Sequence, residues 1–174
     1  MKKLLAITLL VCFLSVGIAN AQTPAATATT TAAGLKLIDA TRGIEFSAPN
    51  GFWGINAGKY SISLNHQTHY DAHVTLKKSW YTVGTAQEAY NKRKESLKSY
   101  LPGAVFIKEN ESLTVGGMPG MAMTYKNPSD LKIIREIMIV HKGQPYELVF
   151  QAKEENFQKV KADFGFILQN LKLF

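Results

Sequence analysis

Cysteine is almost missing from this sequence. The 174 residues contain one cysteine, Cys12, and it lies inside an apolar run near the N-terminus. If that run is a signal that is cleaved off, the rest of the chain has no cysteine. The folded part then has no disulfide framework, no cysteine nucleophile and no cysteine-ligated metal.

A long transmembrane run is missing as well. The apolar run from Leu4 to Ile18 is shorter than the roughly 20 residues that span a bilayer. Two lysines precede it, and the small residues "ANA" follow it. A charged start, a short apolar middle and a small-residue exit are typical of a secretory signal. The sequence therefore predicts a signal peptide over residues 1–21, cleavage near Ala21, and a periplasmic or secreted protein.

Large apolar side chains are absent from residues 22–34, "QTPAATATTTAAG". A segment of this composition cannot bury enough surface to offset the conformational entropy lost on ordering. We expect residues 22–34 to be a flexible Thr/Ala-rich spacer. Residues 35–174 then form a single domain, which is long enough to bury an apolar core.

Acidic side chains are fewer than basic ones, 13 against 20. Two of the lysines lie in the predicted signal, so the remainder carries a formal charge of +5. This balance favours an acidic partner surface, and it permits peripheral contact with an anionic membrane surface. Nucleic acid is not expected as a partner, because the protein is exported and has no motif that interleaves basic and aromatic residues. Another envelope or secreted protein is the expected partner.

Motifs for catalysis are also missing. The sequence has no Gly-x-Ser-x-Gly elbow, no phosphate-binding glycine loop and no His-Glu-x-x-His pair. We therefore expect a protein that is not an enzyme and needs no cofactor. The histidines discussed below are the one feature that could bind zinc.

The sequence is rich in strand patterns. "GIEFSAP" and "YSISLN" alternate apolar and polar residues, as half-buried strands do. Four further strands are expected at Val105–Thr114, Met121–Asn127, Leu131–His141 and Tyr146–Ala152. Gly-Gly, Asn-Pro and Lys-Gly pairs separate them, so neighbouring strands form hairpins and an antiparallel sheet. "IIREIMIV" is apolar on both faces, which predicts a central strand covered on both sides.

Two helices are expected to pack on this sheet. Thr85 and Glu88 are spaced as a capping box after Gly84, and Pro102-Gly103 would end the helix that they begin. Its outer face carries Lys92, Lys94 and Lys98, which form either a docking face or a solvated surface. A second helix is expected in "NFQKVKADFGFILQNLKLF" because apolar residues recur there at helical spacing. That apolar stripe consists of Phe157, Val160, Phe164, Ile167, Leu168 and Leu171.

The stretch "NHQTHYDAH" holds three of the four histidines. His66, His69, Asp71 and His73 are residue types that bind zinc. On an extended strand, however, alternate residues share a face, so His69, Asp71 and His73 fall on the polar side opposite Tyr70, Ala72 and Val74. The stretch is thus either a metal site, using His66, His69 and Asp71, or the solvated face of a strand.

Several motifs together resemble the PsbP-like group, which includes DcrB-like exported proteins and a Ran-binding nuclear import factor. They are "FSAPNGFW", "VGGMPGMAMTY", "GQPYELVFQA" and the phenylalanine-rich final helix, from about Gly43 to the C-terminus. The resemblance implies an α+β fold in which helices sandwich an antiparallel sheet of about six strands. It also implies a non-enzymatic role in binding or assembly outside the cytoplasm. One departure is that Phe52 stands between the turn glycine and Trp53.

Three functions follow as hypotheses. The leading one is an exported binding or assembly-factor module that contacts a protein partner through Phe52, Trp53 and the lysines of the first helix. The second is a metal-binding protein or metal-dependent hydrolase built on the histidine cluster. The third is a carrier of a small apolar ligand held between helix and sheet.

Overall fold

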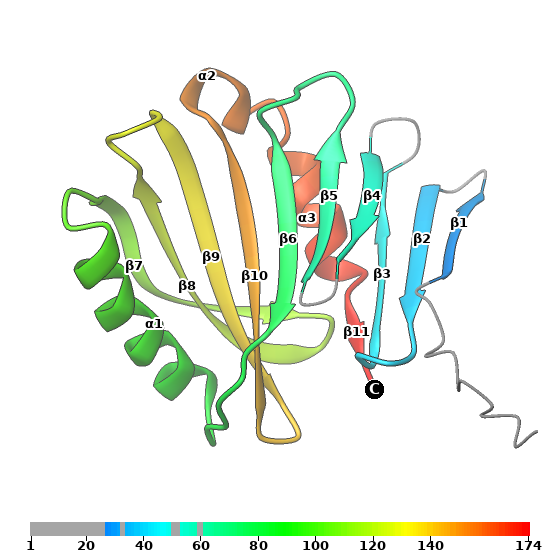
Figure 1. Ribbon diagram of the computed structural model, residues 1–174, viewed down its shortest axis with the longest axis horizontal. Helices are drawn as coiled ribbons and strands as arrows, with labels where there is room; N and C mark the ends of the chain where they lie inside the picture. The colour runs from blue at the N-terminus through cyan, green and yellow to red at the C-terminus, as the bar shows by residue number, and fades with distance from the viewer. Residues whose placement is uncertain (1–26, 32–33, 50–52, 59–60) are drawn as a thin grey trace, which may run out of the picture.

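The computed structural model describes residues 27–31, 34–49, 53–58 and 61–174. Its main feature is a seven-stranded sheet of order β4-β5-β6-β10-β9-β8-β7, in which every neighbouring pair is antiparallel (Figure 1). The strands are β4 (Trp53–Ala57), β5 (Ser61–His66), β6 (His73–Lys78), β7 (Val105–Val115), β8 (Met118–Lys126), β9 (Lys132–His141) and β10 (Gln144–Lys153). The predicted α+β fold with an antiparallel sheet between helices is confirmed.

A second, smaller sheet has the order β1-β2-β3-β11. It consists of β1 (Thr27–Thr31), β2 (Gly34–Asp39), β3 (Ile44–Ala48) and the short C-terminal β11 (Lys172–Leu173). The sequence patterns did not predict this separate sheet, because three of its strands are six residues or shorter and β11 has only two residues. Leu173 pairs with Ile44, so the sheet joins the start of the domain to its end.

The prediction of a flexible spacer over residues 22–34 is wrong at Thr27–Thr31. These residues form β1 and pair in register with β2, from Thr27 opposite Ile38 to Thr31 opposite Gly34. Composition alone did not reveal this, because the strand is stabilised by backbone hydrogen bonds to its neighbour and needs no large apolar side chain. The predicted signal peptide and the rest of the spacer up to residue 26 lie outside the described residues.

Helix α1 (Ala86–Tyr100) begins as predicted. The Thr85 hydroxyl accepts a hydrogen bond from the Glu88 backbone N–H at 3.1 Å, and the Glu88 carboxylate accepts one from the Gly84 N–H at 2.9 Å. The helix lies against β8 and β9 and buries Ala89, Tyr90 and Leu97 over a cluster of methionines and aromatics (Figure 1). That cluster contains Met121, Met123, Tyr125, Ile134 and Met138.

The second predicted helix is broken into two. Helix α2 (Glu154–Phe157) is one turn, and α3 (Lys161–Gln169) follows after a short bend. The expectation that the helix continues through Leu171 is wrong, because the chain leaves it at Asn170 to pair with β3 as β11. The apolar stripe is nevertheless confirmed as an inward face. Phe157, Val160, Phe164, Ile167 and Leu171 are all buried.

Strand β9 has apolar side chains on both faces, as predicted for a central strand. Ile133, Ile137 and Ile139 belong to the core beneath α3, whereas Ile134 and Met138 belong to the core beneath α1. The helices, α1 on one face and α2 and α3 on the other, each cover only part of the sheet. On the α1 side, the side chains of β5 and β6 remain partly exposed (Figure 1).

Candidate functional site

The histidine stretch begins at the buried end of β5. His66 is 4% exposed and shares the inward face of Ile62 and Leu64. Its Nδ1 atom accepts hydrogen bonds from the backbone N–H groups of Thr68 at 3.1 Å and His69 at 2.9 Å. Because Nδ1 is the acceptor, Nε2 carries the proton, and it lies 3.5 Å from Asp163 Oδ2 on α3. His66 is therefore a buried part of the β5–β6 loop.

Burial lowers the pKa of His66, and the neighbouring His69 lowers it further. Asp163 opposes this shift without reversing it. The imidazole is thus held neutral, which agrees with its role as an acceptor for two backbone N–H groups. The expectation that the histidines form a hydrated strand face is wrong for His66.

Asp71 has a different role from the neighbouring histidines, His69 and His73. Its carboxylate accepts hydrogen bonds from the Lys153 N–H at 2.6 Å and from Asn156 Nδ2 at 2.9 Å. Burial would raise the pKa of Asp71, but these hydrogen bonds outweigh it and lower the pKa. Asp71 therefore ties the loop to the start of α2.

The predicted metal ligands do not form a common site. The rings of His66 and His69 lie 4.9 Å apart, but Asp71 is engaged with α2, and His73 Nδ1 lies 2.6 Å from Asn65 Oδ1. Within the residues that the structure describes, no group of three His, Cys, Asp or Glu side chains is placed to hold a metal ion. The cluster is a set of hydrogen bonds that fix the β5–β6 loop.

The aromatic residues proposed as partner contacts are only partly described. Trp53 is 4% exposed and packs edge-on against His66, with ring centroids 4.9 Å apart, and against Phe164 at 6.2 Å. It is a core residue, so the prediction that it contacts a partner is wrong. Phe52 lies outside the described residues.

The lysines of α1 have different surroundings. Lys94 pairs with Glu109 at 3.0 Å, and its ammonium lies 5.6 Å from the ring centroid of Phe106. Lys92 and Lys98 are exposed, and Lys92 lies 5.0 Å from the ring centroid of Tyr81. The three lysines thus do not form one uniform basic patch, and their role in docking stays a prediction.

A network of charges is buried where α1 meets the middle of the sheet. Arg93 of α1 donates two hydrogen bonds to Glu136 of β9, each 2.7 Å long. Its Nη2 atom also lies 3.2 Å from Glu147 Oε1 on β10, and Lys77 Nζ of β6 lies 3.0 Å from the same oxygen. Glu136 and Glu147 are 2% and 5% exposed. Two carboxylates can be buried this close together only because the two cations compensate them.

Tyr125 completes the network by donating a hydrogen bond to Glu136 Oε1 at 2.7 Å. Burial and the adjacent Glu136 charge raise the pKa of Tyr125, so the hydroxyl keeps its proton. Burial also raises the pKa of Glu147, and Glu136 adds to that shift, while Arg93 and Lys77 oppose it. Burial alone would lower the pKa of Arg93, but its bonds to Glu136 raise it overall. Arg93 therefore keeps its charge between the two buried glutamates.

This network lines a cleft of about 310 Å³. The same cleft is lined by Thr75 of β6 and Gln151 of β10, which share the sheet face of Lys77 and Glu147, and by Tyr100 at the C-terminal end of α1. Beyond the cleft, β5 presents Ser63, whose hydroxyl lies 3.4 Å from that of Thr75. The cleft therefore lies beside a polar strand face that none of the described helices covers.

The cleft contains no arrangement for covalent catalysis. Its hydroxyls come from Thr75, Tyr100 and Tyr125, and none of the described side chains around them is a histidine or a free carboxylate that could act as base. Glu136 is engaged by Arg93 and Tyr125. What the cleft offers is hydrogen-bonding groups for non-covalent recognition.

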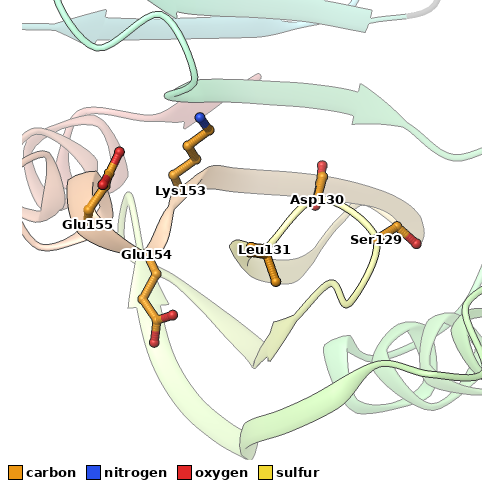
Figure 2. Close-up of a pocket in the computed structure, with 6 residues that line it drawn as sticks. All are labelled: Ser129, Asp130, Leu131, Lys153, Glu154 and Glu155. Atoms are coloured by element: carbon orange, nitrogen blue, oxygen red, sulfur yellow. The ribbon is translucent and has the colours of Figure 1, made fainter.

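A wider hollow of about 710 Å³ lies where the β8–β9 turn meets the start of α2. Figure 2 shows that the six side chains lining it point in different directions and do not converge on one point. Two of its three carboxylates have partners: Glu154 lies 2.5 Å from Lys126 Nζ, and Asp130 lies 3.2 Å from Lys132 Nζ. The hollow is larger than the cleft, but it has no buried charge and no converging groups.

The space between α3 and strands β3, β5, β6 and β10 is filled by side chains. The enclosed gap there has about 0 Å³ of free volume and is lined by Phe46, Ile62, Val74, Leu76, Leu148, Ile167 and Leu171. A carrier of the kind that the sequence suggested would need room at this position.

Among the described residues, no helix is long and apolar enough to cross a membrane.

The chain has an α+β fold of the PsbP-like kind. Its structure is similar to the solution structure of cyanobacterial PsbP (CyanoP) from Synechocystis, with a TM-score of 0.60 and 16% identity, over 80% of this chain and 91% of that one. It is also similar to the Ran-binding protein Mog1p of Saccharomyces cerevisiae, with a TM-score of 0.52 and 10% identity, over 86% and 96%. No protein-family model and no curated protein sequence matches the chain. The resemblance read from the sequence is confirmed as a shared fold.

The residues of the cleft network were not singled out as a site by sequence reasoning. A signal was present, because Glu136 and Glu147 each interrupt an apolar strand and a buried carboxylate requires a partner. Finding Arg93 needed the structure, since it lies 43 residues from Glu136 along the chain. Arg135, next to Glu136 on β9, points to the opposite face and pairs with Glu111 at 2.9 Å.

Proposed function

We propose that this protein is a non-enzymatic binding or assembly module that holds a protein partner in the cleft between α1 and the open half of the sheet. One observation carries the proposal. The buried network of Arg93, Glu136 and Glu147 opens directly onto a cleft of about 310 Å³. That cleft leads onto the uncovered polar face of β5 and β6.

The chemistry of this surface fits a peptide or loop of another protein. Thr75, Gln151 and Lys77 offer donors and acceptors beside the aromatic ring of Tyr100, whose centroid lies 5.1 Å from the Arg93 guanidinium. Tyrosine and arginine are the residue types that contribute most at protein interfaces when they are surrounded by polar groups. A partner that places a polar loop in the cleft would pair with these groups.

We propose further that the protein works outside the cytoplasm. The support is the N-terminal pattern of two lysines, a short apolar run and small residues before Gln22. N-terminal sequencing of protein recovered from the envelope or the medium is expected to start at Gln22. Protein that keeps its first twenty-one residues in the cytoplasm would refute this part of the proposal.

The binding surface can be tested by site-specific photo-crosslinking in intact cells. A crosslinking amino acid at Thr75 or Gln151 is expected to trap one defined partner. The same group at Gln169, exposed on α3 on the other side of the sheet, serves as the matched control and is expected to trap none.

A second variant shows whether the cleft itself is used. Gln151→Arg fills the cleft with a longer cation and is expected to abolish the crosslink formed from Thr75 while leaving the melting temperature close to that of the wild type. If position 169 traps the same partner as position 75, or if Gln151→Arg leaves the crosslink intact, the cleft is not the binding surface.

A further inference from the structure

One end of the molecule is formed by two segments that lie side by side. The segment from Ser79 to Val83, which links β6 to α1, runs along the β9–β10 hairpin (Figure 1). Backbone hydrogen bonds join Ser79 to Pro145 at 3.0 Å and Val83 to Gly143 at 3.2 Å. The Gln144 side-chain amide donates to the carbonyl of Ser79 at 2.5 Å. The linker is therefore held in a defined position.

This held segment presents an aromatic pair to solvent. Trp80 is 95% exposed, more than any other large hydrophobic side chain that the structure describes. Its ring stands edge-on to Tyr81, with centroids 5.8 Å apart, and Lys92 of α1 lies over Tyr81 at 5.0 Å. Because the backbone is fixed by the hairpin, the exposure of Trp80 is a property of the folded protein.

The same end is basic. Residues 76–87 and 140–146 contain no aspartate or glutamate. Lys78 and Lys142 are exposed, and neither makes an ion pair within the described part of the chain. Glu147 is engaged by Lys77 and Arg93, whereas Glu88 in the first turn of α1 accepts from the Gly84 N–H and keeps its charge. Against Lys78, Lys92 and Lys142 this one carboxylate leaves an excess of positive charge at this end.

We propose that this end, made of Trp80, Tyr81, Lys78, Lys92 and Lys142, docks the protein on the surface of an anionic phospholipid bilayer. Tryptophan and tyrosine rings favour the headgroup layer, where the ring meets apolar chains and its polar atom stays hydrated. Uncompensated lysines are attracted to anionic headgroups. This surface is separate from the cleft, and the inference does not rest on the proposed partner binding.

The charge pattern favours a bilayer over a protein partner at this end. The two segments that form this end, residues 76–87 and 140–146, contain no aspartate or glutamate that would set a register or an orientation for a protein partner. A bilayer needs no such register, because its anionic headgroups form a continuous layer. The aromatic pair can then enter the headgroup layer while the lysine side chains extend alongside it.

Vesicle binding tests the proposal directly. The protein from Gln22 onward contains every described element, and it lacks the apolar run that would itself enter lipid. It is expected to sediment with vesicles of phosphatidylglycerol and phosphatidylcholine but not with phosphatidylcholine alone, and less at high salt. Because Trp53 is buried and the chain has two tryptophans, a blue shift of the emission on binding reports on Trp80.

Matched variants separate this end from the rest of the surface. Trp80→Ala is expected to abolish the blue shift and weaken binding, whereas Tyr70→Ala removes an aromatic side chain that is 81% exposed at the opposite end and should change neither. Lys78→Gln and Lys142→Gln are each expected to weaken binding about fivefold. Lys98→Gln, farther along α1, should leave binding unchanged.

Three results would overturn the proposal. The first is no sedimentation with anionic vesicles at low salt. The second is equal binding of Trp80→Ala and Tyr70→Ala, which would mean that the aromatic pair is not in contact with lipid. The third is a crosslink from position 80 to an envelope protein in the absence of vesicle binding, which would assign this end to a protein partner.

Discussion

The carbonyl oxygen of Leu171 lies directly against Gly116, in the turn between β7 and β8. A β-carbon at position 116 would stand 1.8 Å from that oxygen. The Gly116 N–H also donates a hydrogen bond to the Leu168 carbonyl at 3.2 Å. The hairpin at one edge of the main sheet thus supports the chain where it leaves α3 for the second sheet.

This contact predicts that Gly116→Ala destabilises the protein more than Gly117→Ala. Both glycines have positive φ, +54° and +83°, so alanine at either costs about 1–2 kcal/mol in backbone strain. Only position 116 adds a collision, because nothing lies within 4 Å of a β-carbon at 117. Urea unfolding of the two variants measures the difference. Equal losses of unfolding free energy would show that the Leu171 backbone moves away without cost.

Phe164 should be the most sensitive position of α3. Its ring is 4% exposed and packs against Phe150 at 4.7 Å and Phe157 at 5.6 Å between centroids. Phe164→Ala is expected to reduce the free energy of unfolding by roughly 3–5 kcal/mol because it leaves a cavity in the core. Phe174→Ala is the control, since that side chain is 55% exposed. A Phe164→Ala protein that melts with the wild type would place α3 elsewhere.

His66 should make stability depend on pH. Burial lowers its pKa below the ordinary 6.5, so the folded state binds a proton less readily than the unfolded chain. The stabilisation that depends on neutral His66 is complete above about pH 6.5 and is lost as the pH falls from there toward the lowered pKa. The pKa of His73 is also lowered by burial and contributes with the same sign.

We therefore expect His66→Asn to flatten the slope of unfolding free energy between pH 7 and pH 5, and His66→Asn with His73→Asn to flatten it further. Chemical denaturation at several pH values provides the measurement. If the slope of the single variant equals that of the wild type, His66 titrates alike in the folded and unfolded chains.

Arg93 should be essential to the buried network. Arg93→Met leaves Glu136 and Glu147 buried beside each other, and removing one side of a buried ion pair costs about 3–5 kcal/mol. Arg135→Met is the matched control, because the pair of Arg135 with Glu111 is partly exposed and is worth about 0–1 kcal/mol.

The loss in Arg93→Met should shrink in acid. The pKa of Glu147 is already raised above the ordinary 4.5 by burial and by Glu136, and without the guanidinium Glu147 would hold its proton to still higher pH. Its penalty is absent below about pH 4.5 and grows as the pH rises through the raised pKa. A deficit that is the same at pH 4.5 and pH 7 would mean that the two carboxylates are not what the arginine stabilises.

Local sequence information was sufficient for the elements between Val105 and Lys153. The short turns there join consecutive strands into hairpins. The order of these strands along the chain is therefore also their order in the sheet. Thr85 likewise marks the start of α1, since a cap is an interaction between residues three apart. At His66 the strand parity of Ile62 and Leu64 already indicates an inward side chain, and the structure buries it.

The hairpins, the caps and the two apolar faces can be predicted from the sequence, because each depends on residues that are close along the chain. Which charges meet and which aromatic side chain stays exposed follows only from the packing of distant segments. Arg93 and Glu136 stand 43 residues apart, and Trp53 and Trp80 differ in no local signal although one is buried and the other is 95% exposed. Such pairings depend on how the layers pack, and the energy of burying a group is set only when its distant neighbours are in place.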